Sequence, residues 1–136
     1  MRCYINDKYK KKYTWYNTGD LGHFDENKNL VLVGRNDNIF RVGHEKLSPE
    51  EIEIVLKKKF NLNNPIVSKI SDPILGFKPI LVLEKKEKKI SNKKLISELV
   101  KFFSSYKIPK QIFYIDAIPK NHYGKVDRKK VSIFIN

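Results

Sequence analysis

The alternation of apolar and polar positions predicts short strands in the first third of the chain. Aromatic and β-branched residues, which favour the pleated surface of a sheet, are dense at residues 13–16, and apolar runs follow at 21–25, 30–33 and 39–42. Residues 25–29 are polar and typical of a turn, so we expect a β-hairpin around them.

Helical spacing of apolar residues begins after Ser48. Ser48 is a suitable N-cap, Pro49 suits the first helical position, and Glu51 stands where a capping box requires it. A second helix is expected to start near Ser91, and Asp127 is placed to cap a last short one. Between and after these helices, further strands are predicted at residues 66–70, 79–84 and 112–115.

This order of elements predicts a small α+β domain, in which a sheet of mostly antiparallel strands is flanked by two to three helices and preceded by a β-hairpin and a hinge. The 136 residues suffice for one such domain, and 40% hydrophobic residues can fill its core. We place the hinge at residues 34–38, since Gly and Asn tolerate the backbone angles of a pivot. The expected core-facing stripes are Ile52, Val55, Leu56 and Phe60 in the first helix, and Leu95, Leu99, Phe102 and Phe103 in the second.

The chain is strongly basic, with 28 Lys and Arg against 15 Asp and Glu and a formal net charge of +13. Such an excess attracts anions: nucleotides, nucleic acids, anionic membranes or acidic proteins. Most of the excess is Lys in runs such as residues 57–59 and 85–86, which are also typical of a solvated surface or of a composition bias. Both interpretations of the charge stay open.

The compartment is expected to be the cytoplasm, with no membrane partner. No apolar run approaches the ~20 residues of a membrane span, and the polar first twelve residues lack the apolar stretch of a signal peptide. The single cysteine, Cys3, has no partner for an internal disulfide, which fits a reducing compartment.

Two motifs in the first third place polar side chains beside glycines. The Thr-Gly-Asp motif at residues 18–20 ends in Asp20, whose carboxylate can accept two hydrogen bonds from a vicinal diol such as a ribose. In the Gly-Arg-x-Asp motif at residues 34–37, Arg35 offers a planar fork of donors to phosphate or sugar oxygens, and Asp37 lies where backbone angles can change. Structural roles compete with both: Asp20 can close a turn, and Arg35 can form a surface ion pair.

A Pro-x-Asn-x-x-Gly-Lys motif occupies residues 119–125. Its Lys125 follows a glycine in a loop introduced by Pro119, where a positive charge can stabilise negative charge that develops on a carboxylate or phosphate oxygen. The motif lacks the Gly-rich first half of the usual phosphate-binding loop. By itself, Lys125 is one of many lysines in a basic chain.

Together with Ser-Pro-x-Glu-Ile-Glu at residues 48–53, these motifs closely resemble the C-terminal part of the AMP-forming adenylating superfamily. That family includes acyl-CoA synthetases, the adenylation domains of peptide synthetases, and luciferases. Each motif alone is a weak signal, but four in the family's order and spacing are a strong one. The resemblance covers nearly the whole chain from Tyr16 onward.

The resemblance implies two parts: residues 1–34 as the C-terminal edge of the family's large domain, and residues 35–136 as its small C-terminal lid domain. The family joins a carboxylate to ATP, giving acyl-AMP and pyrophosphate, and then lets a thiol attack to give a thioester. The implied cofactors of the complete enzyme are ATP or AMP with Mg²⁺, and the implied acceptor is CoA or phosphopantetheine. The resemblance implies no metal ligand in this chain.

The resemblance also implies a role for each matching residue. Asp20 would hold the ribose of ATP and of the adenylate, and Arg35 would bind ribose or phosphate. Asp37 would be the hinge about which the small domain rotates between the two half-reactions. Lys125 would be the catalytic residue that binds the carboxylate substrate and the α-phosphate during adenylation. The segment facing the pantetheine thiol in the second half-reaction would be Gly43, His44 and Glu45.

One residue departs from the family pattern. Relatives with the Glu-Lys-x-Ser-Pro pattern commonly carry Gly-Gly before it, whereas this chain has His44 at the second position. A glycine there lets the backbone approach the pantetheine arm closely. His44 either narrows that channel, contacts the thiol or phosphopantetheine, transfers a proton, or is a tolerated substitution.

The family's large domain, with its phosphate loop, adenine pocket and acyl pocket, does not fit before Tyr16. We therefore expect no ligation by this chain alone, because positioning supplies much of the rate in such reactions. The expected partner is a large N-terminal adenylation domain, in cis or in trans. An alternative is a basic module that docks an acidic acyl-carrier protein. Nucleic acid is the weakest alternative, because no nucleic-acid fold signature is present.

Overall fold

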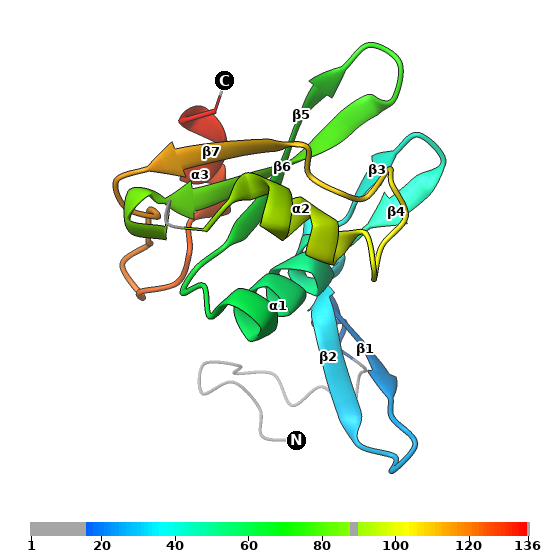
Figure 1. Ribbon diagram of the computed structural model, residues 1–136. Helices are drawn as coiled ribbons and strands as arrows, with labels where there is room; N and C mark the ends of the chain where they lie inside the picture. The colour runs from blue at the N-terminus through cyan, green and yellow to red at the C-terminus, as the bar shows by residue number, and fades with distance from the viewer. Residues whose placement is uncertain (1–15, 88–89, 136) are drawn as a thin grey trace.

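A three-stranded sheet forms the centre of the fold (Figure 1). The computed structural model describes residues 16–87 and 90–135. Strand β5 (Ile66–Asp72) pairs antiparallel with β6 (Gly76–Glu84), and β7 (Gln111–Ile115) pairs parallel with the opposite edge of β6. Because β6 is the central strand, it carries the continuous apolar run that burial on both faces requires.

Helices cover both faces of this sheet, as Figure 1 shows. Helices α1 (Pro49–Phe60) and α2 (Asn92–Leu99) pack on one face, and α3 (Arg128–Ile133) packs on the other. Successive residues of a strand point to opposite faces, so alternate residues of β6 enter two different cores. The larger core contains Leu81 and Leu83 with Ile52, Leu56, Leu95 and Leu99, and the smaller one contains Ile80 and Val82 with Ile118 and Val131.

Two hairpins precede α1. The predicted hairpin is confirmed: β1 (Asp20–Phe24) and β2 (Leu30–Arg35) pair antiparallel and project from the body of the domain (Figure 1). A short 3-10 turn, η1 (Asn36–Asn38), then leads to a second hairpin of β3 (Phe40–Val42) and β4 (Glu45–Leu47). The predicted α+β class is confirmed, while β4 was not predicted.

The helix starts agree with the predicted positions, but the capping hydrogen bond expected of Ser48 does not form. Ser48 is the N-cap of α1 with extended backbone angles, φ −94° and ψ 113°, yet its side chain makes no capping hydrogen bond. Its hydroxyl lies 3.3 Å from Oε2 of Glu50, to which it donates instead. The predicted cap of α3 is confirmed, because Oδ1 of Asp127 accepts a hydrogen bond from the backbone N–H of Lys130 at 3.1 Å.

Helix α2 is shorter than its apolar stripe predicted. It ends at Leu99, after which the chain turns and Phe102 leaves the core. The ring of Phe102 is 50% exposed and lies 5.4 Å from the ammonium nitrogen of Lys59. Phe103, by contrast, packs against the larger core as predicted.

Some predictions fall at the edge of the described residues. The strand predicted at residues 13–16 lies outside them except for Tyr16, which is not in a strand. Cys3 and the polar first twelve residues also lie outside. Among the helices that the structure describes, none is long and apolar enough to cross a membrane.

Candidate functional site

Three of the predicted site residues meet where the first hairpin joins the body of the domain. Nη1 of Arg35 lies 3.0 Å from Oδ1 of Asp20, and Nη2 lies 3.0 Å from Oδ2 of Asp37. The hydrogen bond with Asp37 and the negative charge of Asp20 raise the pKa of Arg35 above its usual value, so the guanidinium stays charged. Asp20 and Arg35 are fifteen residues apart in sequence, so the two motifs come together to form one polar cluster.

Local hydrogen bonds fix the turn that carries Asp20. The backbone N–H of Gly19 donates to Oδ1 of Asn17 at 2.9 Å, and the N–H of Asp20 donates to Oγ1 of Thr18 at 3.2 Å. Gly19 has a φ of +74°, which favours glycine, and a Cβ there would lie 3.1 Å from the guanidinium of Arg35. The Thr-Gly-Asp motif thus does close a turn, and it also leaves Oδ2 of Asp20 without a hydrogen bond to any described residue.

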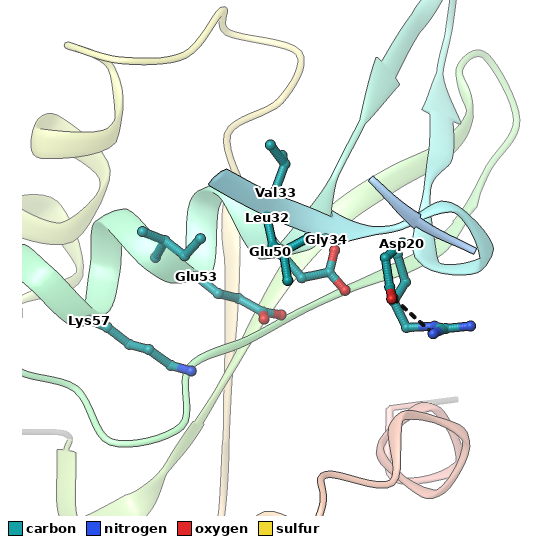
Figure 2. A pocket seen from close by; sticks show the side chains of 9 residues that line it. Asp20, Leu32, Val33, Gly34, Glu50, Glu53 and Lys57 are labelled. Carbon is teal, nitrogen blue, oxygen red and sulfur yellow. Dashed lines mark hydrogen bonds and ion pairs between the residues drawn. The ribbon is translucent and has the colours of Figure 1, made fainter. Parts of the chain in front are cut away.

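A groove runs from this cluster along α1, between the helix and strand β2 (Figure 2). Its volume is about 290 Å³, and Asp20 lies at one end and Lys57 at the other. Both apolar and charged side chains line it, so the groove can contact both the apolar and the polar parts of a ligand. Strand β1 contributes Asp20 to its lining, strand β2 contributes Leu32, Val33, Gly34 and Arg35, and helix α1 contributes Glu50, Glu53, Ile54 and Lys57.

A buried ionic network underlies this groove. Nη1 and Nη2 of Arg128 donate to the two carboxylate oxygens of Glu53 at 2.9 and 2.8 Å, a bidentate pair. Nη1 also donates to the backbone oxygen of Val67 at 3.2 Å, and the N–H of Val67 donates to Oε1 of Glu53 at 2.8 Å. Glu50 joins the network, because its Oε1 accepts from Nη2 of Arg128 at 3.4 Å and from Nδ2 of Asn38. Helices α1 and α3, strand β5 and the predicted hinge are thereby connected.

Gly34 lets strand β2 approach this network. A Cβ at position 34 would lie 2.8 Å from Oε2 of Glu50 and 3.0 Å from Oγ of Ser48. The carboxylate of Glu50 cannot easily move, because Ser48, Asn38 and Arg128 all donate to it. The glycine of the Gly-Arg-x-Asp motif therefore has a steric role in addition to flexibility.

We expect Gly34→Ala to lower the free energy of unfolding by about 1–3 kcal/mol, the usual cost of overpacking. Urea unfolding of this chain measures the change. The matched control repeats the substitution in a Glu50→Ala background, where the obstructing carboxylate is gone and the cost should shrink. An equal cost in both backgrounds would contradict the steric explanation.

The predicted thiol-facing residues lie together where β3 meets β4: Gly43 and His44 form the turn, and Glu45 is the first residue of β4. Gly43 has a φ of +59°, and its N–H donates to the backbone oxygen of Leu75 at 3.0 Å. His44 is exposed at the tip of the turn. Oε2 of Glu45 accepts a hydrogen bond from Oγ of Ser104 at 2.9 Å and lies 3.8 Å from Nζ of Lys107, so Glu45 is tied to the loop after α2.

Lys125 is separate from both groups. It lies in the loop between β7 and α3, which Figure 1 shows on a different side of the domain from the β1–β2 hairpin. Its side chain is exposed and makes no ion pair with any other described residue. The structure therefore brings Asp20, Arg35 and Asp37 together, and it places Lys125 and the turn at residues 43–45 elsewhere.

The network of Glu50, Glu53 and Arg128 was not predicted from the sequence. A signal was present, because Glu53 shares the core-facing side of α1 with Pro49 and Ile52. An acidic residue on an apolar helix face calls for a buried cationic partner, since an unpaired buried charge is costly. No comparable signal in the sequence identifies Arg128 as that partner.

Comparison with known proteins agrees with the motifs. No family model matches the chain. The oxalate–CoA ligase of Saccharomyces cerevisiae is 30% identical over 128 residues, which are 93% of this chain and 23% of that protein. The 2-succinylbenzoate–CoA ligase of Staphylococcus epidermidis is 28% identical over 135 residues, which are 96% of this chain and 28% of that protein.

Solved structures give the same result for the fold. The o-succinylbenzoate CoA synthetase of Bacillus subtilis, in complex with its acyl-adenylate intermediate, matches with a TM-score of 0.75 and 28% identity. The match covers 89% of this chain and 25% of that one. The chain thus spans about a quarter of the length of the curated relatives it matches. Sequence and fold together identify this chain as a C-terminal domain of the AMP-forming adenylating superfamily, to which the acyl-CoA synthetases belong.

Proposed function

We propose that this chain is the mobile C-terminal lid of an AMP-forming acyl ligase, with residues 1–34 at the edge of the large domain and residues 35–136 forming the lid. The enzyme would convert a carboxylate and ATP to acyl-AMP and pyrophosphate, and would then transfer the acyl group to a thiol. The observation that carries the proposal is the meeting of Asp20, Arg35 and Asp37 at the junction of hairpin and lid.

The chemistry of this cluster suits a nucleotide ribose. Asp20 has Oδ2 available, and a carboxylate oxygen can accept more than one hydrogen bond, so Asp20 can receive the two hydroxyls of a vicinal diol while Arg35 stays beside it. Arg35 can donate to ribose or phosphate oxygens with its remaining N–H groups. These two residues would hold the ribose of ATP. In the first half-reaction, ATP supplies the AMP group and releases pyrophosphate.

Asp37 is suited to a hinge by its position. It lies in η1, between the projecting hairpin and β3, and its side chain is 71% exposed. The ion pair of Asp37 with Arg35 is exposed to solvent, and such pairs add little stability, so it is easily broken. A rotation at η1 could separate these side chains at little cost and swing the lid body relative to the hairpin.

The separation of Lys125 from residues 43–45 supports two alternating faces. A lid that rotates can present the Lys125 loop in one half-reaction and the turn carrying His44 in the other, so that each transition state meets its own groups. In the first half-reaction the Lys125 ammonium would bind the carboxylate and the α-phosphate. In the second, Gly43 would let the pantetheine arm pass close to the backbone.

The hairpin exposes apolar side chains that suit burial by a large domain. Phe24 is 71% exposed, and Leu30 and Leu32 are each 61% exposed, on adjacent strands of one two-stranded sheet. Two-stranded sheets with a bare apolar surface are marginal in water without further packing. We infer that a large N-terminal adenylation domain, in cis or in trans, covers this surface.

The acceptor in this proposal is either CoA or an acyl-carrier protein. The loop tied to Glu45 supports an acidic protein partner, because exposed Phe102 and Tyr106 lie in the same loop as the basic residues Lys101 and Lys107. Basic and aromatic side chains together favour docking of an acidic surface. Supplying both acceptors in the test below distinguishes them.

The test is carboxylate-dependent exchange of pyrophosphate into ATP by the whole protein or complex that contains this chain, purified from its source cells. Oxalate and 2-succinylbenzoate are the first probes, since the relatives are named as ligases of these acids. We expect exchange, then thioester formation with CoA or a holo-carrier protein. The isolated chain should show neither, because the large domain supplies the positioning. Exchange by the isolated chain, or none by the whole protein across a panel of carboxylates, would contradict the proposal.

A further inference from the structure

The loop that carries Lys125 is a closed, hydrogen-bonded turn. The N–H of Asp127 donates to the oxygen of Pro119 at 2.9 Å, and Lys120 forms an isolated antiparallel bridge with Val126. The N–H of Asn121 donates to the oxygen of Lys125 at 2.7 Å. This ladder of three levels gives an exposed loop a defined shape.

The side chain of Asn121 fills the inside of that turn. Its Oδ1 accepts hydrogen bonds from the backbone N–H groups of Tyr123 and Lys125, each at 3.0 Å. Its own carbonyl oxygen accepts from Gly124 at 2.9 Å, and Gly124 has the φ of +77° that closes such a turn. Asparagine suits this position, because its short side chain can replace a backbone carbonyl within a turn.

Buried carboxylates anchor both ends of the loop. At its start, Oε1 of Glu84 accepts from the N–H of Ile118 at 3.1 Å, and Nζ of Lys86 lies 2.6 Å from Oε2 of Glu84. Lys86 and the Ile118 amide lower the pKa of Glu84, so this carboxylate stays ionised as an acceptor. At its end, Arg128 makes the bidentate pair with Glu53 of α1.

Within this fixed frame, the ammonium of Lys125 is unpaired with any described residue. The nearest carboxylate in sequence, that of Asp127, accepts from the backbone N–H of Lys130 and lies 3.8 Å from its Nζ. The loop therefore holds the backbone of Lys125 while leaving its charged end available. The backbone of Lys125 therefore needs no further ordering when the ammonium meets an anionic ligand, and only the rotamer freedom of the side chain is lost.

We propose that Asn121 is the positioning residue for Lys125: its Oδ1 holds the Lys125 amide, and thereby sets where the ammonium is presented, before any ligand arrives. This proposal rests on the proposed function in one respect, the identity of the ligand as a carboxylate and a phosphate. The hydrogen bonds of the turn do not depend on the proposed function.

The first measurement is amide hydrogen exchange in this chain. In Asn121→Ala, exchange at the amides of Tyr123 and Lys125 should accelerate about 5- to 30-fold, the effect of losing one or two hydrogen bonds. Asn121→Asp keeps the Oδ1 acceptor and should retain the slow exchange. Amides of the central strand β6 should not change in either variant. Unchanged exchange in Asn121→Ala, or equal acceleration in Asn121→Asp, would overturn the proposal.

The second measurement separates positioning from folding in the whole protein. Asn121→Ala should lower kcat for ATP–pyrophosphate exchange by about 5- to 30-fold, while thioester formation from supplied acyl-AMP stays unchanged. Asn121→Ser keeps a neutral acceptor and should recover part of the rate. Equal loss of both half-reactions would overturn the positioning role. If the wild-type whole protein shows no exchange at all, the proposed function fails, and the amide measurement alone decides whether Asn121 holds the turn.

Discussion

Arg128→Ala is expected to lower the free energy of unfolding of this chain by about 3 kcal/mol, the lower end of the usual cost of removing one partner from a buried ion pair. The loss is large because Glu53 is only 5% exposed and would be left with a single N–H donor, that of Val67. The value lies at the lower end because the Arg128 side chain is 28% exposed, so water can partly replace it. Urea unfolding of the variant and the parent chain measures the difference.

The matched control is Lys129→Ala, which removes the same charge from the neighbouring exposed position of α3. It should change stability by no more than about 0.5 kcal/mol, as surface substitutions usually do. Glu53→Gln keeps an oxygen that can accept from Val67 and tests the pair from the other side. Its cost and that of Arg128→Ala should not add in the double variant, because both remove one interaction. Simple additivity would contradict the proposed coupling.

The ionic network explains how a short C-terminal helix is integrated into the domain. Helix α3 spans only Arg128–Ile133, too few residues to be stable by itself. Val131 inserts into the smaller core, and Arg128 reaches across β5 to Glu53 of α1. The loop that precedes α3 ends at this ion pair. The contacts of Arg128 therefore stabilise the domain and also help to fix the loop that carries Lys125.

Most of the fold could be predicted, because its elements have strong local signals. The apolar run of β6, the helical spacing after Pro49 and the cap at Asp127 each depend on residues close in sequence. Tertiary packing decided the rest. Strand β4 (Glu45–Leu47) has three residues, two of them charged, and forms only because it pairs with β3. Phe102 fits a helical stripe, but the helix ends before it.

For the candidate site, the sequence identified the residues but not the contacts between them. The motifs identified Asp20, Arg35 and Asp37, yet no spacing rule states that one guanidinium would join both carboxylates at 3.0 Å. That contact depends on the register of β1 with β2, in which Asp20 pairs with Arg35. The roles of these residues, and of Gly43, His44, Glu45 and Lys125, stay predictions for the whole enzyme.

Lys125→Ala is expected to slow ATP–pyrophosphate exchange by the whole protein about 10²- to 10³-fold, the usual cost of removing one preorganised donor from a developing negative charge. In the proposed function, the exposed ammonium, on a loop closed by Asn121, would meet the carboxylate and the α-phosphate. Thioester formation from supplied acyl-AMP should be unchanged, because in that half-reaction the lid would present the turn at residues 43–45 instead. Radiolabelled pyrophosphate exchange and a direct thioester assay measure the two steps separately.

Two further variants decide whether Lys125 acts by its charge, its shape or its effect on the fold. Lys129→Ala removes a charge nearby without touching the loop, and both half-reactions should keep their rates. Lys125→Arg keeps the charge on a broader, planar group, and should recover part of the exchange rate if electrostatics dominates. An equal fall of both half-reactions in Lys125→Ala would mean that the residue supports the domain rather than adenylation. A selective fall, partly reversed by arginine, would mean that Lys125 serves adenylation through its positive charge.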